Sequence, residues 1–531
     1  PRFTGILILA IYIICAAAFS FRYKKNKGAD AGYLKNALFG GRNQIGNVIF
    51  VAFIAVIVYL VFTVLRPYPG SAGASYDTDF LWHASNVSAI ARGFPLVSSE
   101  ISYPIVIRYH TLVYILAAHI ASLFRIHPSL VFLNYFWVLM SALLVFSCGL
   151  MLLRFKVKNI AIPLGIMLII FGTGCSAVSW ESINIFLSES YALGLILLFL
   201  FVAFWEDLYV LTDEDSFAAV SSGVAIGLAT AAKGSIGFIL IVCLTLFNLT
   251  AILKKRKKIT ITVLLNFLSV WGIFAFFYLV FYGTDSGILR VGFFIEFDKW
   301  ISYNYVLRGM VDSMNLRHYC NPVAVGVYYM VYFIERVFSI FKFLFDALHW
   351  RLIGIAALFF VKDKNVFAAT SFLLVFALVS LFSTITLCNV FYGAIFYFWF
   401  YGVMAVTVTF VVLTDFVIKK YKSKIVSGLV IVFIAAIISN SASAFRYPIN
   451  QFRNFVSSAP SAEGYIFDKD LYGALEFIRD NLPETYCVLH NYKPGTRSSY
   501  AISAFSEHRS YLASLEYTLN KIGSVDHIYE L

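Results

Sequence analysis

The stretch "SLVFLNYFWVLMSALLVFSCGLMLLRFKVK", residues 129–158, joins a long apolar run to a short basic one. Residues 129–153 are long enough to cross a hydrocarbon core of about 30 Å as one α-helix. The basic residues within 154–158 follow at once, as is typical of a cytoplasmic helix end. The stretch therefore predicts a membrane-spanning helix whose carboxyl end lies on the cytoplasmic side.

The composition of the whole chain indicates the same class of protein. Of its 531 residues, 60% are hydrophobic, only 13% are charged, and 54 are Phe. The mean hydropathy of +0.81 lies far outside the range of soluble domains. Apolar segments of helical length recur along most of the chain, and the alternating segments of a membrane β-barrel are absent. The sequence thus predicts an all-α polytopic membrane protein.

Net charge and cysteine usage exclude other classes. The formal charge is +12, but the basic residues cluster in short runs beside apolar segments, so we interpret them as orientation signals and expect no nucleic-acid partner. The seven cysteines form no CxxC pair, which argues against a zinc site or a disulfide framework.

We predict about 12 or 13 transmembrane helices from segment length and hydropathy. The predicted spans are 4–21, 47–65, 129–153, 159–174, 190–207, 216–232, 234–252, 260–282, 323–345, 365–386, 393–414 and 424–440, with 351–361 as a doubtful addition. The basic runs that mark the cytoplasmic side are 21–28, 154–158, 254–258, 361–364 and 419–424.

These anchors divide the chain into a membrane domain, residues 1–440, and a tail, residues 441–531. Within the membrane domain they predict a first external loop at 66–128, with interfacial helices, and a second at 283–322. They also place Lys233 at the external tip of a helical hairpin. The tail is predicted to be a small extracytoplasmic α/β module, with a helix at 468–484 followed by a strand at 485–492. Because the chain starts at Pro1 rather than Met, a fragment is an open alternative, and so is a truncated tail.

The first external loop carries the densest group of chemically active side chains, in "YDTDFLWHASNVSAIARG", residues 76–93. If 78–92 is helical, Asp79 and His83 are four residues apart and share one face. Such a pair can orient an imidazole, bind a metal ion or act as a general base on a hydroxyl. Asp77 reaches the same opening if the segment before the helix is extended. The alternative is structural, with Asp77 or Thr78 capping the helix.

Short motifs at both ends of the chain resemble a known family. They are "DFLWH" (79–83), "GFP" (93–95), "YH" (109–110), "ALEFIRDNLP" (474–483) and "AFSEHRSYL" (504–512). Together with the external acid and the predicted topology, they resemble the GT-C fold membrane glycosyltransferases, in particular the prokaryotic type that uses polyprenyl-phosphate sugars.

This resemblance implies inverting transfer of a hexosyl or pentosyl group from a polyprenyl-phosphate carrier to a glycan, lipid or protein acceptor. The reaction would take place on the extracytoplasmic face of a prokaryotic plasma membrane, in cell-envelope synthesis. Asp79 matches the general base, with Asp77 as the second candidate. His83 would be a helper or a ligand of a divalent metal ion, Mg²⁺ or Mn²⁺.

The substrate-binding candidates follow from the same resemblance. A basic residue should neutralise the leaving phosphate, either as a point charge from Lys or as a bidentate partner from Arg. The candidates for substrate binding are Tyr109, His110, Lys233, Arg290 and Arg308, with Arg317 as an alternative in the second loop. The structural alternative for Lys233 is a helix-end residue that extends to the interface.

A transporter or flippase of lipid-linked saccharides is the competing function. Such a protein should carry paired ionisable residues near mid-membrane, often within two related halves. Here the acids gather in an external loop, which favours the enzyme. A non-catalytic scaffold would be expected to have lost these acids.

Overall fold

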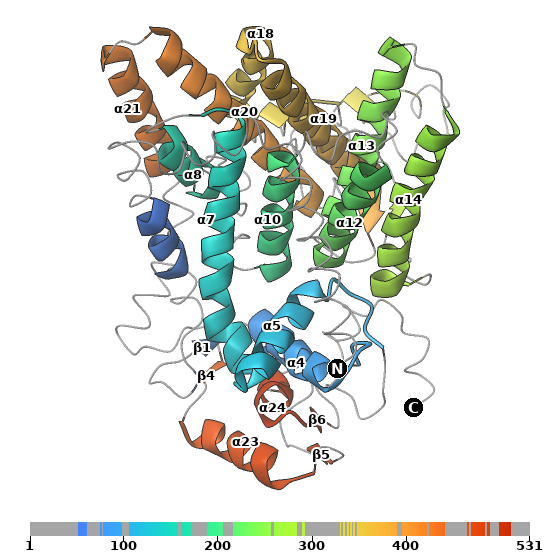
Figure 1. Ribbon diagram of the computed structural model, residues 1–531. Coiled ribbons are helices and arrows are strands. Elements are labelled where there is room, and N and C mark those ends of the chain that lie inside the picture. The colour runs from blue at the N-terminus through green and yellow to red at the C-terminus, as the bar shows by residue number, and fades with distance from the viewer. Residues whose placement is uncertain are drawn as a thin grey trace.

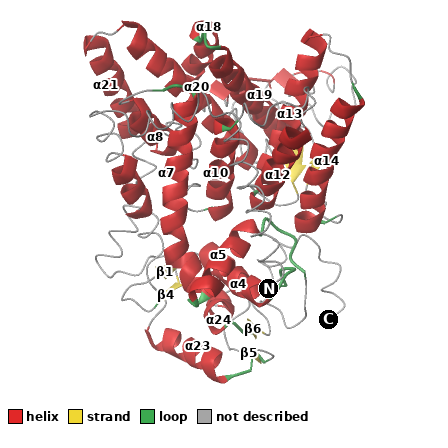
Figure 2. Cartoon of the chain, viewed as in Figure 1, coloured by secondary structure: helices red, strands yellow, loops and turns green. Residues whose placement is uncertain are grey.

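A computed structural model of the chain is mostly helical, with long helices standing side by side and a smaller helical group at one end (Figures 1 and 2). The structure describes residues 51–60, 69, 75–76, 78–97, 106–157, 161–171, 188–204, 216–255, 260–283, 289–291, scattered positions in 326–347, 348–389, 396–421, 424–440, 465–466, 469–483, 486–488 and 499–510.

Four of the described helices are long and apolar enough to cross a membrane. They are Pro128–Arg154, Ile261–Tyr282, Lys364–Thr386 and Tyr397–Tyr421. The first comprises α6 (Pro128–Leu130), a π-helical turn η1 (Val131–Tyr135) and α7 (Phe136–Arg154), and the others are α14 (Ile261–Tyr282), α19 (Lys364–Thr386) and α20 (Phe396–Tyr421). The prediction of a helical, multi-pass membrane protein is confirmed.

Further helices, whose apolar segments are shorter than 18 residues, fill the remaining predicted spans that the structure describes. They are α8 (Ala161–Phe171), α10 (Glu189–Ala203), α12 (Ser216–Ala232), α13 (Gly234–Lys255) and α21 (Lys424–Asn440), with a helical segment at 51–60. The doubtful span 351–361 is a 3₁₀ helix, η3 (His349–Ala356), followed by α18 (Ala357–Phe360). The predicted span 4–21 lies outside the described residues, and 323–345 lies within them only in part.

Neighbouring helices pack in pairs along the bundle. α7 packs on α8 and α10, α12 on α13 and α14, and α19 on α20. Glycine permits the closest approaches: a Cβ at Gly194 would lie 2.3 Å from the Tyr401 hydroxyl oxygen, and one at Gly237 would lie 2.0 Å from the Thr230 hydroxyl oxygen. A side chain at either glycine would push its helix pair, α10 with α20 or α12 with α13, apart.

One end of the bundle gathers three of the predicted basic runs. Lys156, just beyond α7, forms an ion pair with Asp363, just before α19. The ammonium group of Lys419, near the end of α20, donates to the backbone carbonyl of Lys156 over 2.6 Å. The described residues of runs 154–158, 361–364 and 419–424 therefore lie together, as the predicted cytoplasmic anchors require.

The opposite end carries α4 (Thr78–Arg92), α5 (Leu112–Phe124), α23 (Lys469–Asn481) and α24 (Ser499–Ser506) (Figure 1). Short strand pairs accompany these helices. β1 (Ser75–Tyr76) pairs antiparallel with β4 (Tyr465–Ile466), and β5 (Cys487–Val488) pairs parallel with β6 (Arg509–Ser510). A third pair, β2 (Leu289–Val291) with β3 (Leu387–Asn389), is antiparallel and joins the predicted second loop to the end of α19.

Helix α4 has the predicted bounds but not the predicted setting. Every residue from Phe80 to Ile90 is buried, because α5, α6 and α24 pack around the helix. An interfacial helix would expose one polar face to water. The difference arises from the tail, since α24 covers a face that the loop alone would leave open.

Candidate functional site

The structure places some predicted site residues and leaves others undetermined. Asp77 and Arg308 lie outside the described residues. Asp79 lies in the first turn of α4 and Arg290 in β2, and for both the structure describes the backbone position alone.

His83 is the best-defined of the predicted catalytic candidates. It is buried, with 6% of its surface exposed, and aromatic rings surround its imidazole. The ring centroids of Trp82, Tyr114 and Phe132 lie 4.8, 5.5 and 6.4 Å from that of His83. This packing fixes the plane of the imidazole.

The Nδ1 atom of His83 faces two polar partners. It forms a short hydrogen bond with the hydroxyl of Tyr114 from α5. It also lies 3.0 Å from Oε1 of Glu189, the first residue of α10, whose side chain is fully buried. Glu189 lies at the amino end of α10, the end of a helix that favours a negative charge.

Lys233 contacts Ser190, the residue that follows Glu189 in α10. Its ammonium group donates to the hydroxyl of Ser190 over 3.2 Å and lies 3.5 Å from the centre of the Tyr397 ring. Only 7% of Lys233 is exposed, so the side chain points into the bundle instead of extending away from the helix end. A buried cation in contact with a hydroxyl and an aromatic face is typical of a site for anions or polar ligands.

The backbone holds Lys233 firmly in this position. The Tyr282 hydroxyl, at the end of α14, accepts from the Gly234 amide over 2.7 Å and donates to the Thr230 carbonyl over 3.1 Å. The loop between α12 and α13 is thereby tied to α14. The predicted hairpin with Lys233 at its tip matches this arrangement.

These contacts bring together six side chains from five segments of the chain. We call the group the His83–Lys233 site, which consists of His83, Tyr114, Glu189, Ser190, Lys233 and Tyr397. It lies at the end of the bundle that carries α4 and α5 (Figure 1). An acid, an imidazole and a cation thus share one buried region, which can accept a proton and bind an anion.

Tyr109 and His110, the other predicted substrate-binding residues, flank the site on the α4 side. The Tyr109 ring lies 5.3 Å from that of Trp82 and 6.4 Å from that of His83, and His110 is buried beside Tyr109. Arg108, just before them, packs against Gly283 at the end of α14, where a Cβ would collide with its guanidinium. This segment therefore contacts both α4 and the end of α14.

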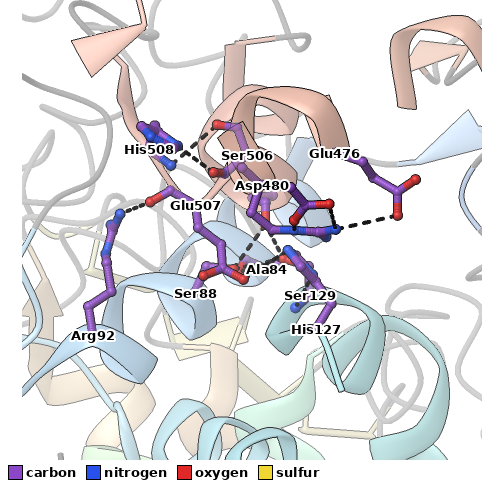
Figure 3. Close-up of polar contacts among 12 residues, drawn as sticks. Ala84, Ser88, Arg92, His127, Ser129, Glu476, Asp480, Ser506, Glu507 and His508 are labelled. Atoms are coloured by element: carbon purple, nitrogen blue, oxygen red, sulfur yellow. Dashed lines mark hydrogen bonds and ion pairs between the residues drawn. The ribbon is translucent and has the colours of Figure 1, made fainter. Parts of the chain in front are cut away.

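The C-terminal tail holds α4 from the side away from the bundle (Figure 3). The hydroxyls of Ser88 and Ser129 both donate to the carbonyl of Ala504 in α24. Nε2 of His127 lies 3.1 Å from a carboxylate oxygen of Glu507, whose backbone carbonyl also accepts from Arg92. The tail is therefore a structural support for the helix that carries His83.

The described residues do not by themselves make a metal site. No three His, Cys, Asp or Glu side chains within the described ranges come together. His83 and Glu189 provide two such groups, and Asp79 precedes His83 by one helical turn. A predicted Mg²⁺ or Mn²⁺ ion would need the carboxylates of Asp77 or Asp79 as further ligands.

Sequence reasoning missed Tyr114, Glu189, Ser190 and Tyr397. Glu189 left a usable signal, since an acid stands directly before the apolar run that begins at 190. An ionisable residue at the edge of a span is a functional candidate by default. Tyr114 and Tyr397 gave no such signal, because aromatic residues at span ends are common.

Comparisons with known proteins give a structural similarity alone. No protein-family model and no curated protein matches the chain. Among solved structures, the chain is similar to the oligosaccharyltransferase of Archaeoglobus fulgidus, in a crystal structure tethered by a disulfide bond to an acceptor peptide with the NVT sequon. The TM-score is 0.45 at 14% identity, over 87% of this chain and 64% of that one, so the similarity spans less than two thirds of the oligosaccharyltransferase.

The fold and the site define a class of protein. The chain is a helical, multi-pass integral membrane protein with a buried polar site at the end of its bundle opposite the clustered basic runs.

Proposed function

We propose that the chain is a membrane glycosyltransferase that moves a sugar from a polyprenyl-phosphate carrier to an acceptor hydroxyl or amide. The observation that carries this proposal concerns two adjacent residues of α10. The imidazole of His83 lies against Glu189, and the ammonium of Lys233 contacts Ser190. Glycosyl transfer from a phosphate carrier needs a proton acceptor and a cation close together.

In this proposal Lys233 binds the phosphate of the donor. The ammonium already contacts a hydroxyl and a ring face, so a phosphate oxygen would replace or join Ser190 as its partner. As the bond between the sugar C1 and the phosphate oxygen breaks, its electron pair leaves with the phosphate, and the charge of Lys233 stabilises the developing anion. Arg290 and Arg308 are proposed to assist from the second loop.

The proton acceptor is proposed to come from the start of α4 or from the residue before it. Asp79 is the candidate that the family resemblance names, with Asp77 as the second and His83 as the helper. The acceptor oxygen attacks C1 from the face opposite the phosphate, which inverts the configuration there. Tyr109 and His110 are proposed to line the acceptor side, since they flank His83.

The clustered basic runs support a proposed cellular setting, because such runs favour the cytoplasm for their end of the bundle. The His83–Lys233 site at the opposite end is accordingly proposed to face the extracytoplasmic side of a prokaryotic plasma membrane. The acceptor is then a glycan, lipid or protein of the cell envelope, and the bilayer supplies the donor.

Transport or flipping of a lipid-linked saccharide is the second candidate function. Burial of Glu189 and Lys233 at helix ends supports it, because ionisable groups inside a helical bundle also serve proton-coupled transport. A transporter would move the donor without breaking its sugar–phosphate bond.

Sugar transfer by purified protein in liposomes tests the proposal. A panel of radiolabelled polyprenyl-phosphate sugars would be offered with glycan, lipid and peptide acceptors. Lys233→Met should lower kcat about 10²- to 10³-fold, the usual cost of removing one charge-stabilising group. Lys420→Gln is the matched control. Lys420 lies in the last turn of α20, at the end opposite Tyr397, so its replacement should leave transfer unchanged.

Transfer that is equal in wild type and Lys233→Met would contradict the role of Lys233. Donor movement across the bilayer without any cleavage would favour the transporter.

A further inference from the structure

The imidazole of His83 is held in one orientation. Its ring is packed among Trp82, Tyr114 and Phe132, and only 7% of its side chain is exposed. Both polar neighbours lie at Nδ1, and none of the described residues forms a hydrogen bond with Nε2. The two nitrogens of the ring therefore have different surroundings.

The proton of a neutral His83 belongs on Nδ1. Oε1 of Glu189 lies 3.0 Å from that atom, and at this distance inside a buried site a carboxylate charge favours a proton on the facing nitrogen. An ionised Glu189 therefore favours the tautomer with hydrogen on Nδ1, and the Tyr114 hydroxyl accommodates it because it can accept as well as donate. This leaves the lone pair on Nε2.

A carboxylate that orients one nitrogen while the other accepts a proton is an arrangement suited to general base chemistry. The carboxylate also stabilises the imidazolium that forms when Nε2 takes a proton. Position supports this use, since Glu189 adjoins Ser190, the partner of Lys233. A proton taken at His83 would come from an acceptor close to the donor phosphate.

We infer that Glu189 is the positioning residue of His83, and that Nε2 of His83, not Asp79, receives the acceptor's proton in the proposed transfer. The inference rests on the proposed function. In the step, the acceptor O–H or N–H proton passes to Nε2, and the freed electron pair forms the bond to C1. The bond between C1 and the phosphate oxygen breaks, and its electron pair leaves on the phosphate beside Lys233.

The tautomer can be measured without any substrate. The full chain in nanodiscs, labelled with ¹⁵N-histidine, contains nine histidines, and His83→Gln identifies the resonances of His83 by their loss. Wild type should show hydrogen on Nδ1 and none on Nε2. Glu189→Gln should shift the population toward hydrogen on Nε2, whereas Asp363→Asn, at the far end of the bundle, should leave it unchanged. Hydrogen on Nε2 in wild type, or no change in Glu189→Gln, would overturn the inference.

Transfer kinetics test the catalytic part. His83→Ala should lower kcat by about 10²-fold or more with little change in KM, as is usual for loss of a general base. Added imidazole should restore transfer to His83→Ala, but much less in the double variant with Glu189→Gln. A loss of transfer in Asp79→Asn, with His83→Ala fully active, would return the role to Asp79 while leaving the proposed function intact.

If no donor supports transfer in any variant, the proposed function fails. The tautomer measurement still decides the role of Glu189 in that case.

Discussion

Replacing Glu507 by Gln should loosen the docking of α24 onto α4 and α6. The Ser129 amide donates to Nδ1 of His127 over 3.2 Å, so the proton of a neutral imidazole lies on Nε2, which faces the Glu507 carboxylate at 3.1 Å. The side chains of His127 and Glu507 are 7% and 22% exposed, so water screens this contact weakly.

The magnitude follows from the change in the acceptor. A hydrogen bond to a charged group contributes about 1.5 to 3 kcal/mol, and one between neutral groups about 0.5 to 1.5 kcal/mol. Because Gln keeps an acceptor but loses the charge, we expect Glu507→Gln to cost about 1 kcal/mol. The undocked fraction of α24 should then rise about fivefold.

The same contact should depend on pH. Burial raises the pKa of Glu507, but His127, Arg479 and Arg92 outweigh it, so the pKa lies below its ordinary value of 4.5. A carboxyl group with a lowered pKa stabilises the docked state above its unfolded pKa and loses that contribution as the pH falls through the folded value. Docking should therefore weaken below about pH 4.5 in wild type and change less in Glu507→Gln.

Hydrogen exchange of residues 499–510, followed by mass spectrometry in nanodiscs and corrected for the intrinsic pH dependence, measures this opening. Asp363→Asn is the control at the opposite end of the bundle and should not alter exchange in α24. Equal exchange in wild type and Glu507→Gln at neutral pH, or protection that increases in wild type as the pH falls below about 4.5, would refute this explanation of docking.

The other predictions concern the supports of the bundle. Tyr282→Phe removes hydrogen bonds to the Gly234 amide and a backbone carbonyl, and should lower the free energy of unfolding by about 1 to 2 kcal/mol in a detergent titration. Gly194→Ala puts a methyl group against the Tyr401 hydroxyl and should cost about 1 to 3 kcal/mol in the same titration. Asp363→Asn breaks an exposed ion pair and should cost less than about 1 kcal/mol. A larger effect of Asp363→Asn than of Gly194→Ala would contradict this ranking.

Local sequence patterns predicted the helices well for a physical reason. The length of an apolar run is set by the membrane, so the run at 129–153 becomes the helix Pro128–Arg154 with nearly the same bounds. The basic runs also predicted correctly that the residues around Lys156, Asp363 and Lys419 lie at one end of the bundle. The helix 78–92, on which the pairing of Asp79 and His83 depends, is present as α4 with these bounds.

The composition of the site depends on contacts that local patterns do not encode. Glu189 meets His83 because α10 packs beside α5, and Tyr397 meets Lys233 because α20 packs on α13. Such contacts are fixed by the packing of whole helices. The burial of α4 escaped prediction for the same reason, since the covering helix α24 comes from the far end of the chain. The predicted roles of Asp77 and Arg308, and of the other candidates whose side chains the structure does not describe, stay predictions.

The most direct test of the central claim is a cryo-EM structure of the full chain in nanodiscs with a polyprenyl-phosphate sugar bound. We predict that a phosphate oxygen lies about 2.7 to 2.9 Å from the ammonium of Lys233, as in charge-assisted hydrogen bonds. The sugar should then lie between Lys233 and His83. A donor phosphate bound at the clustered basic runs, with the His83–Lys233 site closed to it, would contradict the claim.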